Sequence, residues 1–469
     1  MFEKFIITII VMATLSHNTF SAPKYPFPQN SSYKYGVKAT GSNANDIQSE
    51  YRAFINEYYE ESGSYARIKW DQPSQTVSEG IGYGMLITVY MDNSTNNTRS
   101  KFDKLWNYYK KWTNNRGLMH WKIDGFNSVA AENAATDAEL DAALALLMAY
   151  IQWGDQKYLN DAKDLIGKIW DHEVNDNKYL KPGDAWDTRK NPSYFSTGAL
   201  ELFKKVDSHD WSTVINNSYS LLKKCRNNNT GLIPDWCEEN GSPLGDFKYD
   251  AARTPWRMAM AYVWCGHSDA KDIAGTIASW IKENTGGNPA SIVDGYSLNG
   301  NKAGAYNNPT FVGPLSAAGM VSSDHQSWVT SGYNRLALFA GDDGYYNDCL
   351  QMLTMLLLTG NMPNFWDNVT DVVNPPQNSS FSEEIHIGKH PSQGQSMIIH
   401  YTIHQNNQVR LGMYDTKGKL IKTINNRYVK AGCHTETLDL SKESVVSGMY
   451  IIQLKAGSQT FSNALIIAK

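Results

Sequence analysis

The chain has 469 residues, of which 19% are charged, and its formal net charge is −4. A chain of this length forms one large domain with an added module, or about three domains of ordinary size. The small net charge excludes the basic surface that binding to nucleic acid or to an anionic membrane needs, so the expected partner is neutral or weakly charged.

The first 22 residues are typical of an export signal. Lys4 supplies a positive charge near the N-terminus, and residues 5–15 form an apolar stretch. Residues 19–22 supply the small side chains typical of the end of such a signal. The apolar stretch is too short to span a bilayer. We therefore expect a secreted or cell-surface protein with no integral membrane segment once the signal is removed. A second short apolar run, at 352–358, is interpreted as part of a buried helix.

After an irregular arm at 23–45, apolar residues recur with the period of about 3.6 residues that indicates helices. Gly, Pro, Asn and Asp residues typical of loops separate the periodic segments. Paired helices of this number can close into a ring. This toroid of six hairpins is favoured over an irregular α bundle, and over a solenoid because no repeat of about 34 or 40 residues is visible. The predicted helices are 46–61, 78–91, 99–112, 136–152, 155–171, 194–205, 209–225, 249–264, 268–283, 312–319, 324–338 and 343–359.

From residue 371 the pattern changes. A stretch at 371–394, rich in Pro, Asn and Ser at its start, is typical of a linker, and beyond it segments alternate as strands do. We expect an all-α domain at 23–370 and a small all-β sandwich at 395–469. The predicted strands are 397–403, 409–414, 419–424, 448–454 and 461–467.

The segment TVSEGIGYGM, residues 76–85, places one carboxylate, Glu79, beside Gly80, Gly82 and Gly84. Glycine inside a helix costs roughly 1 kcal/mol relative to alanine, so three of them suggest that something approaches the backbone closely. We expect a ligand chain to lie against this helix start. The apolar neighbours of Glu79, which include Tyr83, favour a raised pKa and the role of proton donor.

Two further segments carry acidic residues at expected helix starts. In residues 134–154, Asp137 is either a helix cap or a site residue, and Glu139 and Asp141 are interpreted as solvent-facing. In residues 245–266, Asp250 is again either a cap or a site residue. Arg253 follows it by one turn, where its charge can hold the carboxylate ionised. The Pro-Trp-Arg sequence at 255–257 is expected to interrupt this helix.

Cleavage of a glycosidic bond needs an acid that protonates the leaving oxygen and a second carboxylate on the opposite face of the sugar. The two stand roughly 6.5–9.5 Å apart when the second activates water, and closer when it attacks directly. Glu79 suits the acid and Asp250 the base. Aromatic residues, 12% of the chain, suit stacking on the C–H faces of sugars. This chemistry needs no metal or other cofactor.

Four segments, in this order, resemble the motifs of glycoside hydrolase family 8: SEGIGYGM, ATDAELDAALALLMAYIQWG, NPSYF and YDAARTPWR. The resemblance covers residues 50–360. It implies an (α/α)6 barrel and an inverting mechanism. In that mechanism Glu79 is the general acid, Asp250 is the general base, and Asp137 binds and helps to distort the sugar at the cleavage point.

The same resemblance implies a set of substrate-binding residues. Arg253 and Tyr194 line the site around the catalytic water. Trp121 and Trp186 stack on sugar rings, and Tyr83, beside the proposed acid, is also expected to contact the substrate. A β-1,4-linked polysaccharide is therefore the expected partner.

One departure from the family pattern bears on the substrate. The cellulases of the family usually read A-T-D-G-D, whereas Ala138 and Glu139 follow Asp137 here, which alters the local shape of the central subsite. Thr136 stands where the xylanases tend to have Pro, which favours a β-1,4-glucan. We expect a secreted endo-β-1,4-glucanase acting on cellulose or mixed-linkage β-glucan. Xylan or chitosan as the substrate, and a non-catalytic glycan-binding protein, are the alternatives.

The C-terminal segments LGMYDTKGKLIKTI, AGCHTETLDLS and SGMYIIQLKAG resemble the type IX sorting domains of secreted proteins from Bacteroidetes-type bacteria. Such a domain addresses a protein to an outer-membrane secretion machinery. A carbohydrate-binding module or a plain stabilising domain is the alternative. The segment contains no Trp for a sugar-binding platform, and sorting is therefore favoured.

Five cysteines permit disulfide bonds in an oxidising compartment, and the odd number leaves at least one thiol free. Cys225 with Cys237 would close a short loop. Cys265 with Cys349 would require two distant helices to meet.

Overall fold

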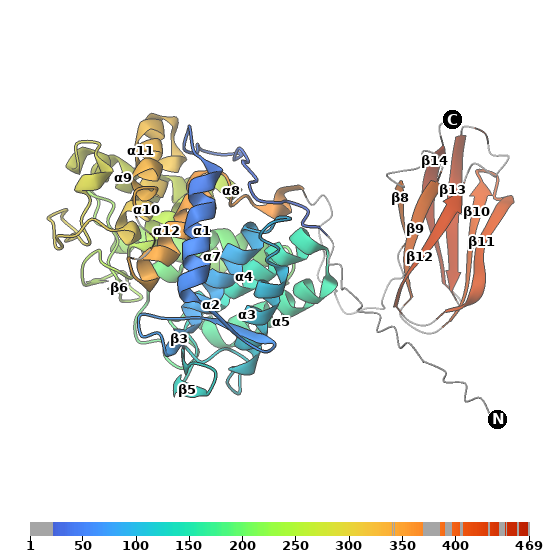
Figure 1. Cartoon of the computed structure of the whole chain (residues 1–469), viewed down its shortest axis with the longest axis horizontal. Helices are drawn as coiled ribbons and strands as arrows, with labels where there is room; N and C mark the ends of the chain where they lie inside the picture. The colour runs from blue at the N-terminus through green and yellow to red at the C-terminus, as the bar shows by residue number, and fades with distance from the viewer. Residues whose placement is uncertain are drawn as a thin grey trace, which may run out of the picture. The chain divides into compact units, whose positions relative to one another are not determined.

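The computed structural model describes residues 22–339, 341, 343–368, 385–389, 396–403, 407–429, 432–439, 446, 448–456 and 459–467. The chain divides into two compact units, Met1–Pro375 and Pro376–Lys469 (Figure 1), which are described separately. Of the expected signal peptide at 1–22, all but Ala22 lies outside the described residues.

Twelve α-helices in the described part of the first unit form two layers. Each even-numbered helix contacts the next even-numbered one, and α12 contacts α2, so these six helices close a ring. The odd-numbered helices lie outside the ring: α3, α5, α7, α9 and α11 each contact the helix before them, and α1 contacts α12. The bounds are α1 (Ala44–Tyr58), α2 (Ser78–Tyr90), α3 (Arg99–Lys111), α4 (Thr136–Trp153), α5 (Gln156–Glu173), α6 (Thr197–Phe203), α7 (Trp211–Cys225), α8 (Arg253–Cys265), α9 (Ser268–Asn284), α10 (Pro309–Ala317), α11 (Gln326–Leu336) and α12 (Tyr345–Leu358).

All twelve predicted helices are present, and the predicted apolar run at 352–358 is buried within α12. The largest difference in bounds is at the start of α8, which begins at Arg253. The expected interruption by Pro255 is wrong. This proline lies in the first turn of α8, where a backbone N–H has no partner within the helix, so its absence costs nothing.

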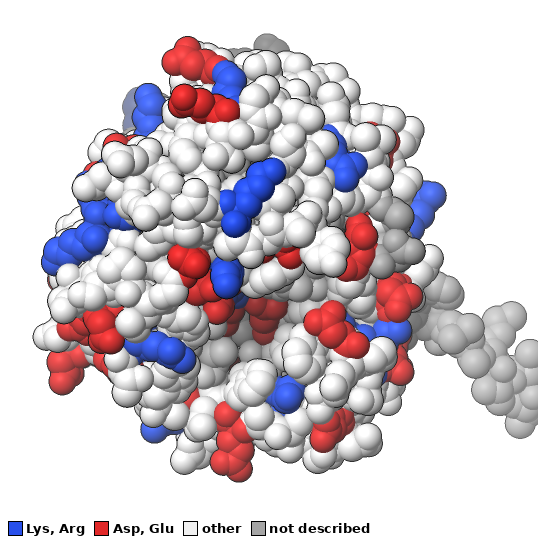
Figure 2. Space-filling model, turned by 90° about the vertical axis from the view of Figure 1, so that its left-hand side faces the viewer, with Lys and Arg blue, Asp and Glu red and all other residues white. Residues whose placement is uncertain are grey.

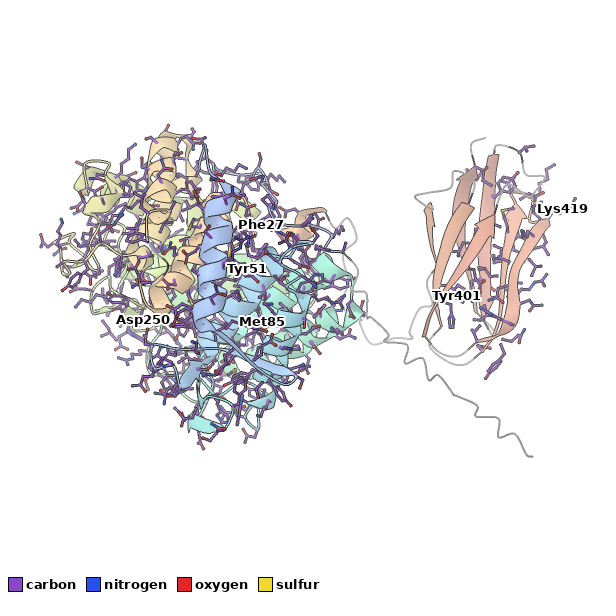
Figure 3. The ribbon with its side chains drawn as sticks, in the orientation of Figure 1. Phe27, Tyr51, Met85, Asp250, Tyr401 and Lys419 are labelled. Atoms are coloured by element: carbon purple, nitrogen blue, oxygen red, sulfur yellow. The ribbon has the colours of Figure 1, made fainter. Side chains whose placement is uncertain are left out.

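Burial distinguishes the two layers. Nearly every residue of α2, α4 and α12 is buried, as expected of helices that are apolar all round. The outer helix α1 instead buries one stripe that includes Tyr51, whereas Met85 of α2 lies within the helical core (Figure 3). The inner ring is therefore the core of the unit, and any charged residue on it needs a protein partner or a cavity.

The glycines beside Glu79 allow close packing within the chain, which accounts for the bare backbone without the expected ligand chain. A Cβ atom at Gly82 would lie 3.1 Å from the carbonyl oxygen of Ala138 in α4. A Cβ at Gly84 would lie 2.8 Å from the side chain of Ile68. Bare backbone at these positions lets neighbouring elements of the same chain approach α2 closely.

Short strands and 3-10 turns, which periodicity did not predict, connect the helices. The strand β3 leads directly into α2 and pairs with β4, so a small sheet fixes the start of the helix that carries Glu79. The strands are β1 (Tyr59–Ser62), β2 (Tyr65–Ile68), β3 (Gln75–Val77), β4 (Lys122–Asp124), β5 (Ser128–Ala131), β6 (Trp236–Cys237) and β7 (Pro243–Leu244). The 3-10 turns are η1 (Pro192–Tyr194), η2 (Pro289–Ser291), η3 (Ala318–Val321), η4 (Ser323–His325) and η5 (Phe365–Asn368).

The described part of the second unit is all-β. Two antiparallel sheets, with strand orders β11-β10-β13-β14 and β12-β9-β8, share one cluster of buried residues that includes Tyr401 and Leu411. The five predicted strands are present, and β12 was not predicted. Strand β8 lies within the expected linker at 371–394, and its pairing with β9 makes that part of the linker a sheet edge. The bounds are β8 (Ile385–Lys389), β9 (Ser396–Ile403), β10 (Asn407–Asp415), β11 (Leu420–Val429), β12 (Gly432–Asp439), β13 (Gly448–Ala456) and β14 (Gln459–Ile467).

Across the described residues of both units, no helix is long and apolar enough to cross a membrane.

Candidate active site

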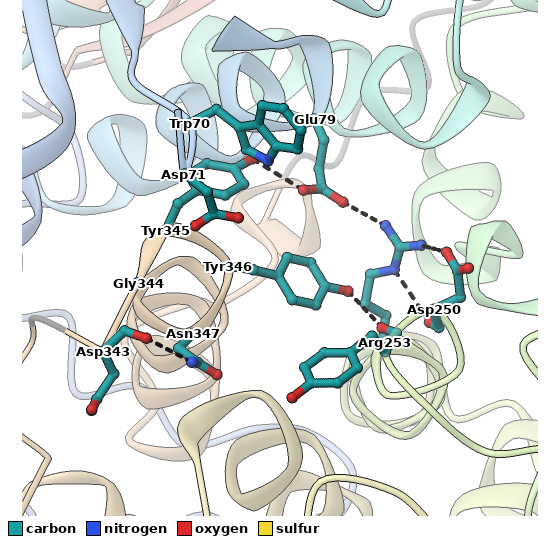
Figure 4. Close-up of a pocket in the computed structure, with 11 residues that line it drawn as sticks. Trp70, Asp71, Glu79, Asp250, Arg253, Asp343, Gly344, Tyr345, Tyr346 and Asn347 are labelled. Carbon is teal, nitrogen blue, oxygen red and sulfur yellow. Dashed lines mark hydrogen bonds and ion pairs between the residues drawn. The ribbon is translucent and has the colours of Figure 1, made fainter. Parts of the chain in front are cut away.

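A pocket with a cavity of ≈ 430 Å³ lies where the inner helices begin. Its volume falls in the range of roughly 300–1,000 Å³ that is usual for ligand sites. Four carboxylates and one guanidinium line it together with several aromatic rings (Figure 4). Figure 2 shows a hollowed face of the molecule in which acidic side chains gather. The lining residues are Trp70, Asp71, Glu79, Tyr249, Asp250, Arg253, Asp343, Gly344, Tyr345, Tyr346 and Asn347.

Arg253 joins the three carboxylates that the sequence analysis singled out. Its Nη1 lies 2.6 Å from Oε2 of Glu79 and 2.7 Å from Oδ2 of Asp137. Its Nη2 lies 2.9 Å from Oδ1 of Asp250. Glu79 and Asp250 each contact a terminal nitrogen of the same planar guanidinium, over 2.6 and 2.9 Å. Their contacting oxygens therefore lie within about 8 Å of each other. The structure therefore brings these four residues together.

The helix starts explain this convergence. Glu79 and Asp137 are each the second residue of an inner helix, α2 and α4, and Arg253 is the first residue of α8. The N-terminal ends of three inner helices therefore meet at one end of the ring. Asp137 is not a helix cap: Ala135 occupies the N-cap position of α4, and no side chain caps it there.

Burial raises the pKa of Glu79 to about 7, with the Arg253 guanidinium acting in the opposite direction. The charges of Asp137 and Asp250 add to the rise, and a hydrogen bond from Tyr345 lowers the pKa. The hydroxyl of Tyr345 donates to Oε1 of Glu79 over 3.0 Å. Burial likewise raises the pKa of Asp137 to about 6. A carboxyl with a pKa near 7 keeps its proton in about half of the molecules at neutral pH, which suits a general acid.

Asp250 has a different environment, because its side chain is 35% exposed and three N–H donors converge on it. Asn191 donates from Nδ2 to Oδ1 over 3.1 Å, and Trp236 donates from Nε1 to Oδ2 over 3.1 Å. Arg253 supplies the third donor. The amide of Asn191 is itself oriented, because its oxygen accepts from both the backbone and the hydroxyl of Ser193. These donors fix the carboxylate at the pocket wall.

A second ion pair lies one helical turn below the first. Both terminal nitrogens of Arg257 contact the two oxygens of Asp141, each over 2.6 Å. The exposed fraction of each side chain is at most 2%. The interpretation of Asp141 as solvent-facing is therefore wrong. Two carboxylates on α4, Asp137 and Asp141, face two guanidinium groups on α8 and tie these inner helices together.

Glu139 is also buried rather than solvent-facing, with an exposed fraction of 0%. It accepts a hydrogen bond from the hydroxyl of Tyr109 over 3.0 Å, and burial together with the nearby charge of Glu173 raises its pKa well above the usual value. The extra methylene of Glu at this position, where the family motif has Asp, therefore extends into the helical core.

The remaining predicted substrate-binding residues differ in their exposure and in their position relative to the pocket. The ring of Tyr194 lies under the Arg253 guanidinium, at 5.1 Å from its centre. Trp121 and Trp186 are 37% and 38% exposed, so both rings are accessible to a ligand. Tyr83 is fully buried and packs edge-on against Trp256, and the structure does not bring it to the pocket surface.

Several site residues escaped the sequence reasoning. Tyr345 and Tyr346 open α12 after a glycine and line the pocket, and Trp70 precedes β3. Trp236 lies beside Trp186, with ring centroids 5.6 Å apart. Asn191 was within a quoted motif but received no role. The sequence signal for them is weak, and only Tyr345 and Tyr346 carry one: two adjacent aromatic residues directly after a glycine at the start of a helix.

A ring of helices whose first turns bring carboxylates into one acidic pocket with aromatic walls is an arrangement suited to cutting glycosidic bonds. The class of protein that these features define is a glycoside hydrolase. The chain belongs to glycosyl hydrolases family 8, because the model of that family matches residues 25–360. A second family model, the secretion system C-terminal sorting domain, matches residues 391–468.

Known relatives agree with this assignment. The chain is 36% identical to endoglucanase 2 of Ruminiclostridium josui over 77% of this chain and 82% of the relative. It is 32% identical to a beta-glucanase of Niallia circulans over 73% of this chain and 92% of the relative. The apo structure of a beta-1,3-1,4-glucanase from Paenibacillus sp. X4 superposes with a TM-score of 0.68, at 30% identity, over 72% of this chain and 99% of that chain.

Proposed function

We propose that the protein is a secreted endo-β-1,4-glucanase that hydrolyses cellulose or mixed-linkage β-glucan with inversion at the cleaved carbon. Glu79 is the general acid and Asp250 the general base. The observation that carries the proposal is that the two carboxyl groups bound by Arg253 have different environments. Glu79 is buried and has a pKa of about 7, whereas Asp250 is more exposed and accepts hydrogen bonds from three N–H groups.

The reaction balances with these two groups and one water. Glu79 gives its proton to the glycosidic oxygen as the bond from that oxygen to the anomeric carbon breaks. Asp250 takes a proton from the water that attacks the same carbon from the opposite face. The products are two shorter chains, and proton exchange with solvent restores both carboxyl groups. The limit of about 8 Å on the oxygen separation is compatible with a water between the base and the sugar.

Arg253, Asp137 and Tyr194 support this chemistry. The positive charge of Arg253 balances the negative charges of both catalytic carboxylates. When substrate and water enter, they replace the direct contacts of Arg253 with Glu79 and Asp250. Asp137 binds the sugar at the cleavage point and helps to distort its ring. Tyr194 lies beside the guanidinium and borders the space for the catalytic water.

Exposed aromatic rings extend the site beyond the carboxylates. Trp121 and Trp186 stack on sugar rings, and Trp236 continues the Trp186 surface towards the base. The closed ring of six helix pairs is the (α/α)6 barrel expected for the family. The relatives that are named endoglucanase or beta-glucanase support a glucan as the substrate. Export would use the N-terminal signal and the C-terminal sorting domain, with an outer-membrane secretion machinery as partner.

Reducing-sugar release from carboxymethylcellulose, barley β-glucan, xylan and chitosan tests the substrate class. We expect release from the first two. Release from xylan or chitosan alone would overturn the substrate, and no release from any of them would overturn the enzymatic function. The variant Glu79→Gln should lose about 10²–10⁴-fold in kcat, the usual contribution of general acid catalysis. The exposed Glu57 on α1 offers the matched control Glu57→Gln, which should keep wild-type turnover.

The anomeric form of the first product tests inversion. Proton NMR of fresh cello-oligosaccharide digests should show the α-anomer before mutarotation. An initial β-anomer would mean direct attack by a carboxylate and would remove Asp250 from the role of base.

A further inference from the structure

Two loop segments meet beside the proposed base. Lys190 and Cys237 form an antiparallel β-bridge, in which each backbone N–H donates to the carbonyl oxygen of the other, over 2.8 and 3.0 Å. Their chain neighbours Asn191 and Trp236 are the residues whose side chains donate to Asp250. The bridge therefore sets the positions of two of the three donors on that carboxylate.

Successive side chains of an extended segment point to opposite sides. Asn191 and Trp236 point to the pocket, whereas Lys190 and Cys237 point away from it. The amino group of Lys190, which is fully buried, contacts Asp187 and lies 3.0 Å from Oε2 of Glu239. One strand of the bridge is thus anchored by ion pairs, and the anchor of the other strand is Cys237.

Cys237 is fully buried and its thiol contacts that of Cys225, the last residue of α7, and both are free thiols in the structure. Packing around the pair is close. A Cβ at Gly241, in the turn between β6 and β7, would lie 2.5 Å from Cβ of Lys224, so this turn lies against the end of α7. Cys265 and Cys349 have other neighbours, Glu201 for the first and Asp348 for the second.

We propose that Cys225 and Cys237 form a disulfide bond in the exported protein, and that this bond anchors the Lys190–Cys237 bridge to α7. Cys237 is then held covalently to the outer helix α7, and its neighbour Trp236 holds the base by a hydrogen bond. The inference rests on the proposed export, because disulfides persist in oxidising compartments.

The bond forms by thiol–disulfide exchange with a protein disulfide of the dithiol–disulfide oxidoreductase class. The two cysteine thiols lose two protons and two electrons and an S–S bond forms. The disulfide of the oxidoreductase takes up the same protons and electrons and becomes a dithiol. In the folded protein the contact with Cys237 and burial raise the pKa of the Cys225 thiol. Since the thiolate is the attacking species, the exchange takes place before the loop 226–236 closes over the pair.

Alkylation of the full chain in denaturant, followed by intact mass measurement, counts the free thiols. The chain has five cysteines, so one bond leaves three alkylated groups without reductant and five with it. For protein made in an oxidising compartment we expect those counts. Cys237→Ser should give four alkylated groups and Cys265→Ser, the matched control, two. Five alkylated groups in the unreduced wild type, or a cross-linked peptide joining another pair, would overturn the proposal.

Thermal unfolding and turnover test the anchoring role. Reductant should lower the melting temperature of the wild type and of Cys265→Ser by roughly 4 °C, as expected for a short closed loop in a domain of this size, and should not change that of Cys237→Ser. Reduction should also lower kcat several-fold with little change in KM, because the donors on the base shift. A bond that forms without either effect would overturn the anchoring role. The thiol count does not depend on hydrolysis, so it stands even if the proposed substrate is wrong.

Discussion

The hydrogen bond from Tyr345 to Glu79 gives the proposed acid a testable pKa. The bond favours the ionised form of Glu79 and so lowers its pKa. Removing the hydroxyl in Tyr345→Phe should raise that pKa above about 7. A hydrogen bond to a charged group contributes about 1.5–3 kcal/mol, and one pKa unit corresponds to about 1.4 kcal/mol. Because the Glu79 side chain is 19% exposed, we take the lower end and expect a rise of about one unit.

The assay is the pH dependence of kcat/KM on a soluble β-glucan, which reports the pKa values of the free enzyme. Glu79 must be protonated to act, so activity is lost as pH rises through its pKa. In Tyr345→Phe this alkaline limb should move to higher pH by about one unit. An unmoved limb, or a limb that moves to lower pH, would refute either the bond or the role of Glu79 as acid.

Tyr333 on the outer helix α11 supplies the matched control. Its hydroxyl donates to Oδ2 of Asp46 over 2.7 Å, so Tyr333→Phe also breaks a tyrosine–carboxylate bond, but neither residue lines the pocket. Its alkaline limb should coincide with that of the wild type. A shift of equal size in this variant would show that the change in the pH profile has a cause other than the contact with Glu79.

Three further substitutions test the packing and the donors around the site. Gly80→Ala should lower kcat about tenfold with little loss of stability. Its Cβ would lie 2.9 Å from the hydroxyl of Tyr345 and push that ring away from Glu79. Steady-state kinetics measure the first effect and a melting curve the second. Arg257→Met should lower the free energy of unfolding by about 3–5 kcal/mol, because Asp141 is left buried without its partner; urea titration measures this. Trp236→Phe should lower kcat about tenfold with nearly unchanged KM, because the ring remains and the N–H donor to the base is lost.

Local patterns were enough to predict the helices and the central carboxylates. Apolar periodicity depends on which residues share a face, and that is a property of neighbours in the sequence. The motif segments around Glu79, Asp137 and Asp250 could likewise be recognised one by one. Their meeting on Arg253 follows from the ring, since each lies at the start of an inner helix.

Contacts between residues far apart in the sequence account for the predictions that differ from the structure. Asp141 resembles a solvent-facing charge on a helix until Arg257, 116 residues further along the chain, is placed opposite it. Gly82 and Gly84 suggested an approaching ligand, whereas neighbouring elements of the same chain fill that space. Tyr345 was missed for the same reason, because its contact with Glu79 joins residues separated by 266 positions.

The charge balance of the site follows from the same geometry. Four carboxylates line the pocket with a single guanidinium, so a neutral chain such as a glucan enters without added repulsion, whereas an anionic chain is opposed. Carboxymethylcellulose with a low degree of substitution should therefore be cut faster than a highly substituted preparation, and the difference should shrink as salt screens the charges. Equal rates on both preparations would contradict this reading of the pocket.

The dependence of rate on the leaving group tests the division of roles between Glu79 and Asp250 most directly. An aryl β-cellobioside with a strongly acidic phenol needs no protonation on departure, so Glu79→Gln should recover most of the wild-type rate on it while remaining inactive on cello-oligosaccharides. Asp250→Asn should stay inactive on both, because the water still needs its base. Recovery in Asp250→Asn, or failure to recover in Glu79→Gln, would contradict the assignment of acid and base.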